Sequence, residues 1–266
     1  MAKITEIFNL KNKNAIVTGG YGHLGKGMVK SLLTCGCNVI VAGRSKEKYI
    51  NAFPNSTENN LHFQEIDIMS SESIEICFSE VHKRFGSIDI LINNAHSAKG
   101  NSQENMSDED WNYTIEGVVG STHKAIRTII PYMKQQKAGK IINITSMYGI
   151  VSPDFENLYM GNNCEKYTNP PHYGAAKAAM IQLTKYYAVL LGKNNIHVNA
   201  ISPGPFPKEI IQNENPEFIN RLKNKNPLKK IGKPEDLAGV IALLSSPASD
   251  FITGQTFQVD GGWTIW

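Results

Sequence analysis

The stretch TGGYGHLG (Thr18–Gly25) decides the fold of this chain. It follows a short apolar, β-branched run, Ala15–Thr18, and it leads into a helical pattern from about Leu24 to Leu33. Glycines between a strand and a helix permit a tight turn, and the free N–H groups at the helix start attract a diphosphate. A lone glycine cluster is weak support, but this one opens a chain of alternating strand and helix patterns. That context favours a dinucleotide-binding turn.

Strand and helix patterns continue to the end of the chain. Apolar runs predict seven strands: Ala15–Thr18, Asn38–Ala42, Leu61–Ile66, Ile88–Ile92, Lys140–Ile144, Ile196–Ile201 and Thr256–Val259. Helical patterns lie between them, at about Leu24–Leu33, Ser71–Phe85, Asp108–Gln136, around Tyr173 and at Pro234–Leu244. Continuous apolar strands separated by helices are typical of a parallel sheet covered on both faces. We expect an α/β fold with a doubly wound parallel sheet of about seven strands, in one domain over residues 1–266.

Composition limits the classes of function. The chain has 266 residues, a net charge of +3, seven histidines without H-x-x-x-H spacing, and four cysteines (Cys35, Cys37, Cys77, Cys164) without C-x-x-C spacing. No apolar run approaches the ~20 residues that cross a bilayer, and the N-terminus lacks the apolar centre of a secretory leader. We therefore expect a cytoplasmic protein with reduced thiols and with no nucleic acid, membrane or metal partner.

Tyr173 and Lys177 form the most informative pair of polar residues. Residues four apart share one face of a helix, so the ammonium group can lie beneath the phenol. A free phenol has a pKa of about 10, and a nearby cation favours the phenolate, which would suit proton transfer near neutral pH. On their own, a Tyr and a Lys at this spacing usually lie on a solvent-exposed face of a helix. Its position downstream of the glycine turn and Ser146 favours a catalytic role.

The end of the second strand bears on the choice of cofactor. An Asp or Glu there would hydrogen-bond the ribose of NAD and repel a 2′-phosphate. This chain instead continues as Ala42-Gly43-Arg44-Ser45, where Arg44 suits a phosphate and Ser45 adds a hydrogen-bond donor. We expect NADP(H) to be preferred, with NAD(H) as the alternative. The competing interpretation is that Arg44 is an ordinary surface residue.

Taken in order, these motifs resemble the short-chain dehydrogenase/reductase family from about Leu10 to Gly262. The matching pieces are TGGYGHLG, Asp67 after the third strand, Asn93-Asn94-Ala95, Ile144-Thr145-Ser146, Tyr173 with Lys177, Asn199–Gly204, Ile252–Gln255 and Val259–Gly262. The resemblance implies a Rossmann-type sheet, a nicotinamide cofactor, and hydride transfer at a carbonyl or alcohol carbon. It also implies a homodimer or homotetramer that acts on a small molecule.

The family's site residues carry over by position. Tyr173 would be the general acid/base, Ser146 would hydrogen-bond the substrate oxygen, and Lys177 would lower the pKa of Tyr173 and hold the ribose. The residues expected to bind cofactor are Thr18, Gly19, Tyr21, Gly22, His23, Leu24, Gly25, Arg44, Ser45, Asp67, Ile68, Asn94, Ala95, Tyr173, Lys177, Pro203, Gly204 and Phe206. Asp67 could instead cap the next helix, and Asn93 is better interpreted as a support of the sheet.

The chain departs from the family pattern in three short motifs. His23 stands where the short form has its second glycine, a spacing similar to the longer sugar-nucleotide epimerase and dehydratase branch, although we expect the rest of the chain to match the shorter branch. The Asn that joins the lysine in a proton relay is replaced by Val118, or by Gly117 after a one-residue shift. A Thr that meets the nicotinamide carboxamide is missing near Lys208, so Phe206 is expected by that pocket.

The fourth departure is an insertion at about residues 152–172. Ser146 and Tyr173 lie 27 positions apart, against roughly a dozen in the family, and the extra segment is polar. Because it joins two catalytic residues, we expect it to line the substrate site. Candidate substrate residues are His96, Tyr148, Tyr167 and Lys208. His96, Lys99 and Lys208 would make the mouth of the site cationic and suit a phosphate or carboxylate.

These features favour an NADP(H)-dependent oxidoreductase acting on a polar, sugar-derived substrate. The combination of GYGHLG, NPPHYGAAK and SPGPFP also looks like family members associated with bacterial surface-glycan and flagellin-glycan biosynthesis. One alternative is a ketoreductase of acyl thioesters, which shares most of these motifs. Another is a nucleotide-binding sensor or scaffold protein without turnover, which the missing relay Asn would suit.

Overall fold

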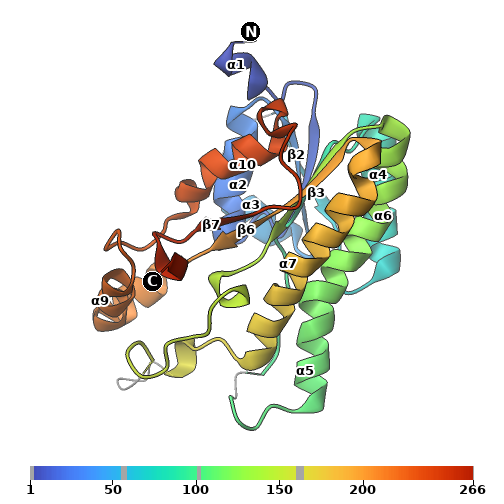
Figure 1. Cartoon of the computed structure of the whole chain (residues 1–266). Helices are drawn as coiled ribbons and strands as arrows, with labels where there is room; N and C mark the ends of the chain where they lie inside the picture. Colours follow the sequence, from blue (N-terminus) through green and yellow to red (C-terminus); the bar gives the residue numbers. More distant parts are fainter. Residues whose placement is uncertain (1–2, 55–58, 101–102, 160–164, 266) are drawn as a thin grey trace.

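Seven parallel strands form one sheet at the centre of the molecule (Figure 1). The computed structural model describes residues 3–54, 59–100, 103–159 and 165–265. The strands are β1 (Asn14–Thr18), β2 (Asn38–Gly43), β3 (Leu61–Glu65), β4 (Ile90–Asn93), β5 (Gly139–Ile144), β6 (Ile196–Pro203) and β7 (Thr256–Val259). Their order across the sheet is β3-β2-β1-β4-β5-β6-β7. The predicted Rossmann-type doubly wound fold is confirmed.

Helices cover both faces of the sheet, as the figure shows (Figure 1). One face carries α2 (His23–Thr34) and α10 (Ala238–Ser245), and the other carries α4 (Ser71–Phe85), α6 (Ser121–Gln136) and α7 (Pro171–Leu191). Strand β1 supplies both apolar layers because its side chains alternate: Ile16 packs on the second face, while Ala15 and Val17 pack on the first. All five residues of β1 are buried, which explains why the strand reads as one continuous apolar run.

The long helix expected at Asp108–Gln136 is interrupted. The structure has α5 (Asp108–Ile115), a π-helical turn η1 (Glu116–Gly120) and then α6. Gly117 explains the interruption, because its carbonyl accepts hydrogen bonds from Ser97 N at 3.0 Å and from Ser121 Oγ at 2.9 Å. A Cβ at Gly117 would collide with the Ser97 carbonyl. The turn therefore lets the loop after β4 lie directly against the helix.

The remaining elements are short. They are α1 (Ile4–Ile7), α3 (Lys46–Ala52), α8 (Glu209–Glu214), α9 (Pro216–Lys225) and the 3-10 turns η2 (Met147–Gly149), η3 (Glu165–Tyr167), η4 (Gly192–Asn194), η5 (Pro234–Leu237), η6 (Pro247–Ser249) and η7 (Trp263–Ile265). The predicted Pro234–Leu244 helix is thus η5 followed by α10. Among the described residues, no helix is long and apolar enough to span a membrane. The three cysteines described are free, and Cys164 lies outside the described residues.

The insertion packs against α9. Its described parts are residues 152–159 and 165–172, and residues 160–164 lie outside the described residues. Tyr159 and Tyr167 both contact the ring of Phe218 in α9, with ring centroids 5.7 and 4.9 Å away. Asp154 Oδ2 also lies 2.6 Å from Lys225 Nζ at the end of α9. A separate apolar cluster, distinct from the two layers on the sheet, thus joins the insertion to α9.

Candidate functional site

Hydrogen bonds lock the ends of β1 and β4 together. Thr18 Oγ1 donates to the Ile92 carbonyl at 3.2 Å and accepts from the backbone N–H groups of Asn94 and Ala95, both at 3.0 Å. Asn94 Nδ2 donates in return to the carbonyls of Thr18 at 2.9 Å and Gly19 at 3.1 Å. Thr18 is buried within this network and does not line the cavity described below. Its role is to hold the glycine turn.

Gly25 allows α2 to begin directly on the turn. A Cβ there would lie 2.5 Å from the Gly19 carbonyl oxygen and 2.7 Å from Gly20 Cα. Only glycine, which has no Cβ, can be accommodated at so short a distance. Gly25 therefore lets the helix pack against the turn, and like Thr18 it does not line the cavity. The start of α2 therefore presents its N–H groups to the cavity from a fixed position.

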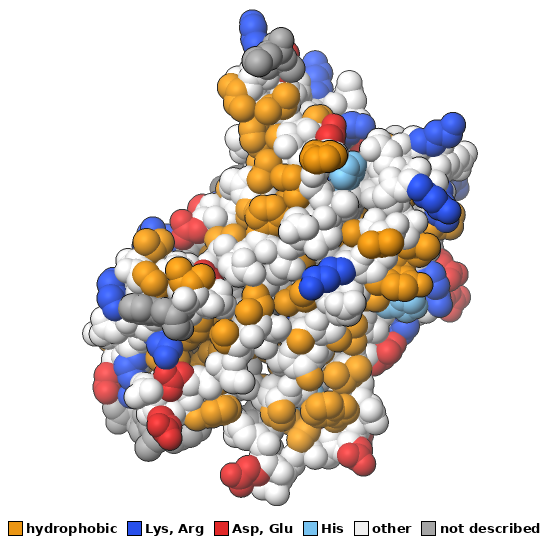
Figure 2. Space-filling model, in the orientation of Figure 1, with side chains coloured by type: hydrophobic (Ala, Val, Ile, Leu, Met, Phe, Trp, Pro, Cys, Tyr) orange, Lys and Arg blue, Asp and Glu red, His pale blue; other side chains and the backbone are white. Residues whose placement is uncertain are grey.

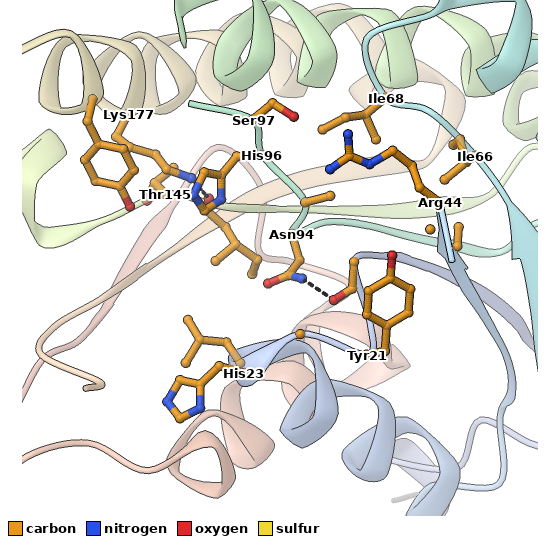
Figure 3. Close-up of a pocket in the computed structure, with 18 of the residues that line it drawn as sticks. Tyr21, His23, Arg44, Ile66, Ile68, Asn94, His96, Ser97, Thr145 and Lys177 are labelled. Atoms are coloured by element: carbon orange, nitrogen blue, oxygen red, sulfur yellow. Dashed lines mark hydrogen bonds between the residues drawn. The ribbon is translucent and has the colours of Figure 1, made fainter. Parts of the chain in front are cut away.

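A cavity runs along the carboxyl edge of the sheet, as the close-up shows (Figure 3). Its open volume, counting the part that opens to solvent, is about 1070 Å³. Residues from six strand ends and from α2 and α7 line it: Gly19, Tyr21, Gly22, His23, Leu24, Ala42, Gly43, Arg44, Ile66, Ile68, Asn94, Ala95, His96, Ser97, Ile144, Thr145, Tyr173, Lys177 and Lys208. Tyr21 and Arg44 lie at one end, and Lys177 lies at the other, with the Tyr173 ring beside it.

The lining carries positive charge only. The described residues that line the cavity include three basic side chains, Arg44, Lys177 and Lys208. They include no Asp or Glu. Arg44 is exposed, and the structure records no ion pair for it in the described part of the chain. Ser45 does not line the cavity, because its hydroxyl caps α3 by accepting a hydrogen bond from Lys48 N at 3.1 Å. The cavity thus favours an anionic ligand, with Arg44 rather than Ser45 available at its far end.

Ser146, Tyr173 and Lys177 meet at the near end. Ser146, directly after β5, is hydrogen-bonded to Tyr173 and accepts a second hydrogen bond from Tyr148 N at 3.1 Å. Lys177 Nζ lies 5.7 Å from the centre of the Tyr173 ring and donates to the Ile144 carbonyl at 2.7 Å. The structure therefore brings together the three residues that the sequence assigned to catalysis. A hydroxyl, a phenol and an amine so placed can share a proton with one substrate oxygen.

The pKa of Tyr173 departs from its ordinary value in the opposite direction to our expectation. Burial raises the pKa of the phenol, and the hydrogen bond from Ser146 offsets only part of this effect. Burial also lowers the pKa of Lys177 to about 7. A lysine with that pKa is only partly protonated at neutral pH, so it is a weaker cation than the sequence suggested. A phosphate or another anion in the cavity would favour the charged lysine.

His96 faces Tyr173 across the cavity. The two rings lie 5.9 Å apart, edge to face. Desolvation lowers the pKa of the imidazole to about 4, and the charge of Lys177 adds to this effect. His96 is therefore neutral at pH 7 and can donate or accept a hydrogen bond at the catalytic end.

Some lining residues were missed from the sequence: Ala42, Gly43, Ile66, Ser97, Ile144 and Thr145. Five of them lie at or next to the carboxyl end of a strand, where chain position alone could have indicated them. Polar side chains were the basis of the sequence prediction instead. The polarity of Thr145 would have suggested a hydroxyl in the cavity, but that hydroxyl donates to the Ile201 carbonyl at 2.9 Å, inside the protein.

Other expected site residues lie outside this cavity. Asp67 Oδ1 accepts a hydrogen bond from Met69 N at 3.0 Å, and Ser70 rather than Asp67 caps α4. Tyr148 is hydrogen-bonded to Tyr159, and Tyr167 stacks on Phe218 of α9.

The segment at the end of β6 and just after it does not line the cavity either. Pro203 is buried within the strand, and Gly204 N donates to the Val259 carbonyl at 3.0 Å. Phe206 packs into the apolar layer under α10. Asn93 Nδ2 donates to Asn143 Oδ1 at 2.9 Å, which agrees with a role in the sheet.

Comparison with known proteins agrees with this geometry. Residues 22–264 match a protein-family model described as Enoyl-(Acyl carrier protein) reductase. The uncharacterized oxidoreductase YgcW of Escherichia coli K12 is 31% identical over 98% of this chain and 95% of its own length. FabG of Staphylococcus epidermidis, a 3-oxoacyl-[acyl-carrier-protein] reductase, is 31% identical over 94% of this chain and 98% of its own. The 7alpha-hydroxysteroid dehydrogenase of Bacteroides fragilis is 31% identical over 96% of this chain and 95% of its own.

Solved structures show the same architecture. A putative gluconate dehydrogenase from Agrobacterium tumefaciens superposes with a TM-score of 0.87 at 27% identity, covering 98% of this chain and 99% of that one. A gluconate 5-dehydrogenase from Burkholderia cenocepacia, in complex with NADP and tartrate, gives 0.86 at 25% identity with coverage of 98% and 99%. A short chain dehydrogenase from Leptospira borgpetersenii with bound NAD+ gives 0.86 at 27% identity with coverage of 100% and 97%. Relatives of this chain thus bind either nicotinamide cofactor.

Proposed function

The chain belongs to the short-chain dehydrogenase/reductase family of NAD(P)-dependent oxidoreductases, and from that premise we propose that it uses NADP(H) to oxidise or reduce a polar, sugar-derived substrate. The observation that carries the proposal is the meeting of Ser146, Tyr173 and Lys177 at one end of a cavity that begins at the glycine turn. The cavity fits a dinucleotide phosphate, because its lining is cationic and the start of α2 is fixed beside it.

The chain's own residues handle the proton of the reaction. When bound, the nicotinamide cofactor supplies or takes up the hydride. Tyr173 Oη gives a proton to the carbonyl oxygen in reduction and takes it from the alcohol in oxidation. Ser146 Oγ hydrogen-bonds the same oxygen and stabilises the negative charge that develops there. Lys177, charged in the loaded site, favours the phenolate of Tyr173 and lowers the cost of the transfer.

Replacing the phenol tests this mechanism. Tyr173→Phe removes the proton donor but keeps the ring, so we expect turnover to fall by about 10²- to 10⁴-fold while the affinity for the cofactor stays within a factor of a few. Steady-state kinetics and fluorescence titration of the nicotinamide measure the two quantities. Full turnover by the variant would show that Tyr173 is not the acid/base.

Arg44 supports the preference for NADP(H). It stands at the end of β2, it lines the cavity, and no carboxylate accompanies it there among the described residues. An Arg–phosphate pair is frequently bidentate and charge-assisted. Arg44→Ala should weaken NADPH binding by about tenfold, equivalent to roughly 1.4 kcal/mol, and leave NADH binding unchanged. An unchanged preference for NADPH would remove Arg44 from this role.

The proposed substrate is a polyol, sugar acid or sugar derivative, such as those used in bacterial glycan biosynthesis. The support is a polar insertion beside the catalytic residues, His96 opposite Tyr173, and two structural neighbours described as gluconate dehydrogenases. The FabG relatives favour a second candidate, reduction of 3-oxoacyl thioesters. A panel of sugar acids, sugar phosphates and 3-oxoacyl thioesters, followed by nicotinamide absorbance, separates the two. Cofactor binding without turnover on any of them would favour a sensor or scaffold role.

We also propose a cytoplasmic homodimer or homotetramer. The face of the molecule formed by α5 and α7 exposes hydrophobic side chains (Figure 2), and Tyr186 and Val189 of α7 are 62% and 86% exposed. A second copy of this face would cover them, as in closed symmetric oligomers. Light scattering after size-exclusion chromatography gives the number of subunits. A monomer at micromolar concentration would contradict this part of the proposal.

A further inference from the structure

His172 directly precedes Tyr173 in the first turn of α7, and its side chain is completely buried. Neighbouring residues on a helix point about 100° apart, so the imidazole contacts a different segment from the phenol. Its Nε2 lies 2.7 Å from the Lys99 carbonyl oxygen. Because a carbonyl can only accept, Nε2 is the donor in this hydrogen bond. His172 thus links the start of α7 to the loop after β4.

Lys99 contributes its backbone to this link, and not the charge that the sequence suggested. Its side chain does not line the cavity, and the ammonium lies 4.4 Å from the centre of the Tyr113 ring. Lys99 N donates to Thr114 Oγ1 at 3.0 Å, and the same hydroxyl donates back to the Lys99 carbonyl at 3.2 Å. The carbonyl therefore accepts from α5 and from α7, which run side by side (Figure 1).

The same loop brings His96 to the catalytic end of the cavity. The imidazole of His96 lies near Lys177 in the close-up (Figure 3), and its ring centre is 5.9 Å from that of Tyr173. Beyond His96, the loop is held at Ser97, whose N–H donates to a carbonyl of η1 at 3.0 Å, and at Lys99. The His172 hydrogen bond joins this loop to the turn that carries Tyr173. It therefore bears on how far apart the two rings lie.

Stability does not explain a histidine at position 172. Nδ1 is buried and has no hydrogen-bond partner in the described part of the chain, and an unpaired buried polar atom opposes folding. A phenyl ring would carry no such atom and could still pack beside Trp111, whose ring centre is 6.2 Å away. The Lys99 carbonyl would keep Thr114 as a donor. A side chain that lowers stability directly beside a catalytic residue is typical of a functional constraint.

We propose that His172 is a positioning residue, whose hydrogen bond to the Lys99 carbonyl sets the separation between Tyr173 and His96 on either side of the substrate. His172 does not line the cavity, so it acts through these two residues and not by contact with substrate or cofactor. The inference rests on the proposed function, because it concerns the geometry in which Tyr173 transfers its proton.

Replacing the imidazole by a phenyl ring separates positioning from stability. His172→Phe should lower kcat by about tenfold, because the reacting groups are no longer held at one separation. The affinity for NADPH should stay near that of the wild type, and the melting temperature should be no lower. His82→Phe in α4 is the matched control: its Nδ1 is also buried without a partner in the described chain, and it does not line the cavity. This control should keep the kcat of the wild type.

Two amide variants test the hydrogen bond itself. The amide nitrogen of His172→Gln can reach the position of Nε2, whereas that of the shorter His172→Asn cannot. We expect His172→Gln to recover most of kcat and His172→Asn to stay low. This pair also decides the matter if His172→Phe does not fold.

Hydrogen exchange tests the link without any substrate. The N–H groups of Ser97 and Lys99 are both hydrogen-bonded, so their exchange reports how firmly the loop is held. Exchange at both should be about five- to tenfold faster in His172→Phe and His172→Asn, and near that of the wild type in His172→Gln.

Other results would overturn the inference. Wild-type kcat in His172→Phe, or equal kcat in the Gln and Asn variants, would show that the hydrogen bond does not position the reacting groups. Parallel losses of kcat, NADPH affinity and melting temperature would mean that His172 only supports the fold. If the wild type bound no nicotinamide nucleotide, the proposed function would fail, and faster exchange at Ser97 and Lys99 would still support the link between the loop and α7.

Discussion

The glycine turn and the insertion both border the catalytic residues, but different kinds of contact hold them. Close backbone packing and hydrogen bonds to the backbone hold the turn: Gly25 approaches Gly19 closely, and the Asn94 side-chain amide donates to the carbonyls of Thr18 and Gly19. Side chains hold the insertion, through rings that pack on Phe218 and through one ion pair. The close approach at Gly25 leaves no room for an added atom, whereas each ring contact of the insertion can be removed by shortening one side chain. The turn should therefore control cofactor binding, and the insertion should control substrate binding.

The largest loss of stability should come from the aromatic contact of the insertion. Phe218 is 4% exposed and contacts both Tyr159 and Tyr167. Phe218→Ala should lower the free energy of unfolding by about 3 kcal/mol and raise the substrate KM, because the insertion loses its main support. The affinity for NADPH should stay near that of the wild type. Chemical denaturation, steady-state kinetics and nucleotide titration measure the three quantities, and an equal loss of cofactor affinity would show that the two regions are not independent.

A smaller change at the turn should have the opposite functional signature. Gly25→Ala places a methyl group 2.5 Å from the Gly19 carbonyl oxygen, so the turn or α2 must shift, at a cost of about 1–3 kcal/mol. Both NADPH and NADH should bind at least tenfold more weakly. Gly239→Ala in α10 is the matched control, since nothing lies within 4 Å of its Cβ, and it should stabilise the protein by up to about 1 kcal/mol. Equal behaviour of the two variants would contradict a steric role for Gly25.

The same difference in contacts explains what the sequence could predict. Apolar runs locate the five inner strands because nearly all of their residues are buried, and the glycine turn is recognisable because only glycine fits at Gly25. The break in the helix at Gly117 was not predictable, because it depends on Ser97, which lies twenty positions earlier and packs against it. Side-chain partners distant in sequence give no local pattern.

Two features of the site were not predictable for that reason. Tyr167, expected at the substrate, stacks its ring on Phe218, which only the fold brings close. Lys177 was expected to lower the pKa of Tyr173, yet burial lowers its own pKa to about 7 and raises that of the phenol. The four-residue spacing shows which helix face the two side chains share. It does not show how deeply the protein buries them.

Loss of the hydrogen bond between Tyr148 of η2 and Tyr159 of the insertion should have a moderate effect. Tyr148 and Tyr159 share a hydrogen bond, and burial raises the pKa of both phenols. Tyr159→Phe leaves the Tyr148 hydroxyl buried without its partner, which should cost about 1 kcal/mol, whereas the double variant with Tyr148→Phe should cost less. Because Tyr148 N donates to Ser146 Oγ, we expect kcat to fall in the single variant and to recover in part in the double variant. Denaturation and kinetics of the three variants complete the cycle, and strictly additive effects would mean that the two hydroxyls act independently.

The ion pair between the insertion and α9 should have the smallest effect, and its pH dependence has a definite sign. The hydrogen bond from Lys225 is the main reason that the pKa of Asp154 lies below its ordinary value of 3.8. A carboxyl group with a lowered pKa in the folded state stabilises it above its unfolded pKa, and that contribution disappears as the pH falls through the folded value. Asp154→Asn should therefore cost less than about 1 kcal/mol and raise the substrate KM no more than about twofold, equally at every pH from 5 to 8. Since Lys225 is 38% exposed, 1 M salt should remove most of the difference. A KM difference that changed with pH between 5 and 8 would point to another titrating group and would separate the insertion from this pair.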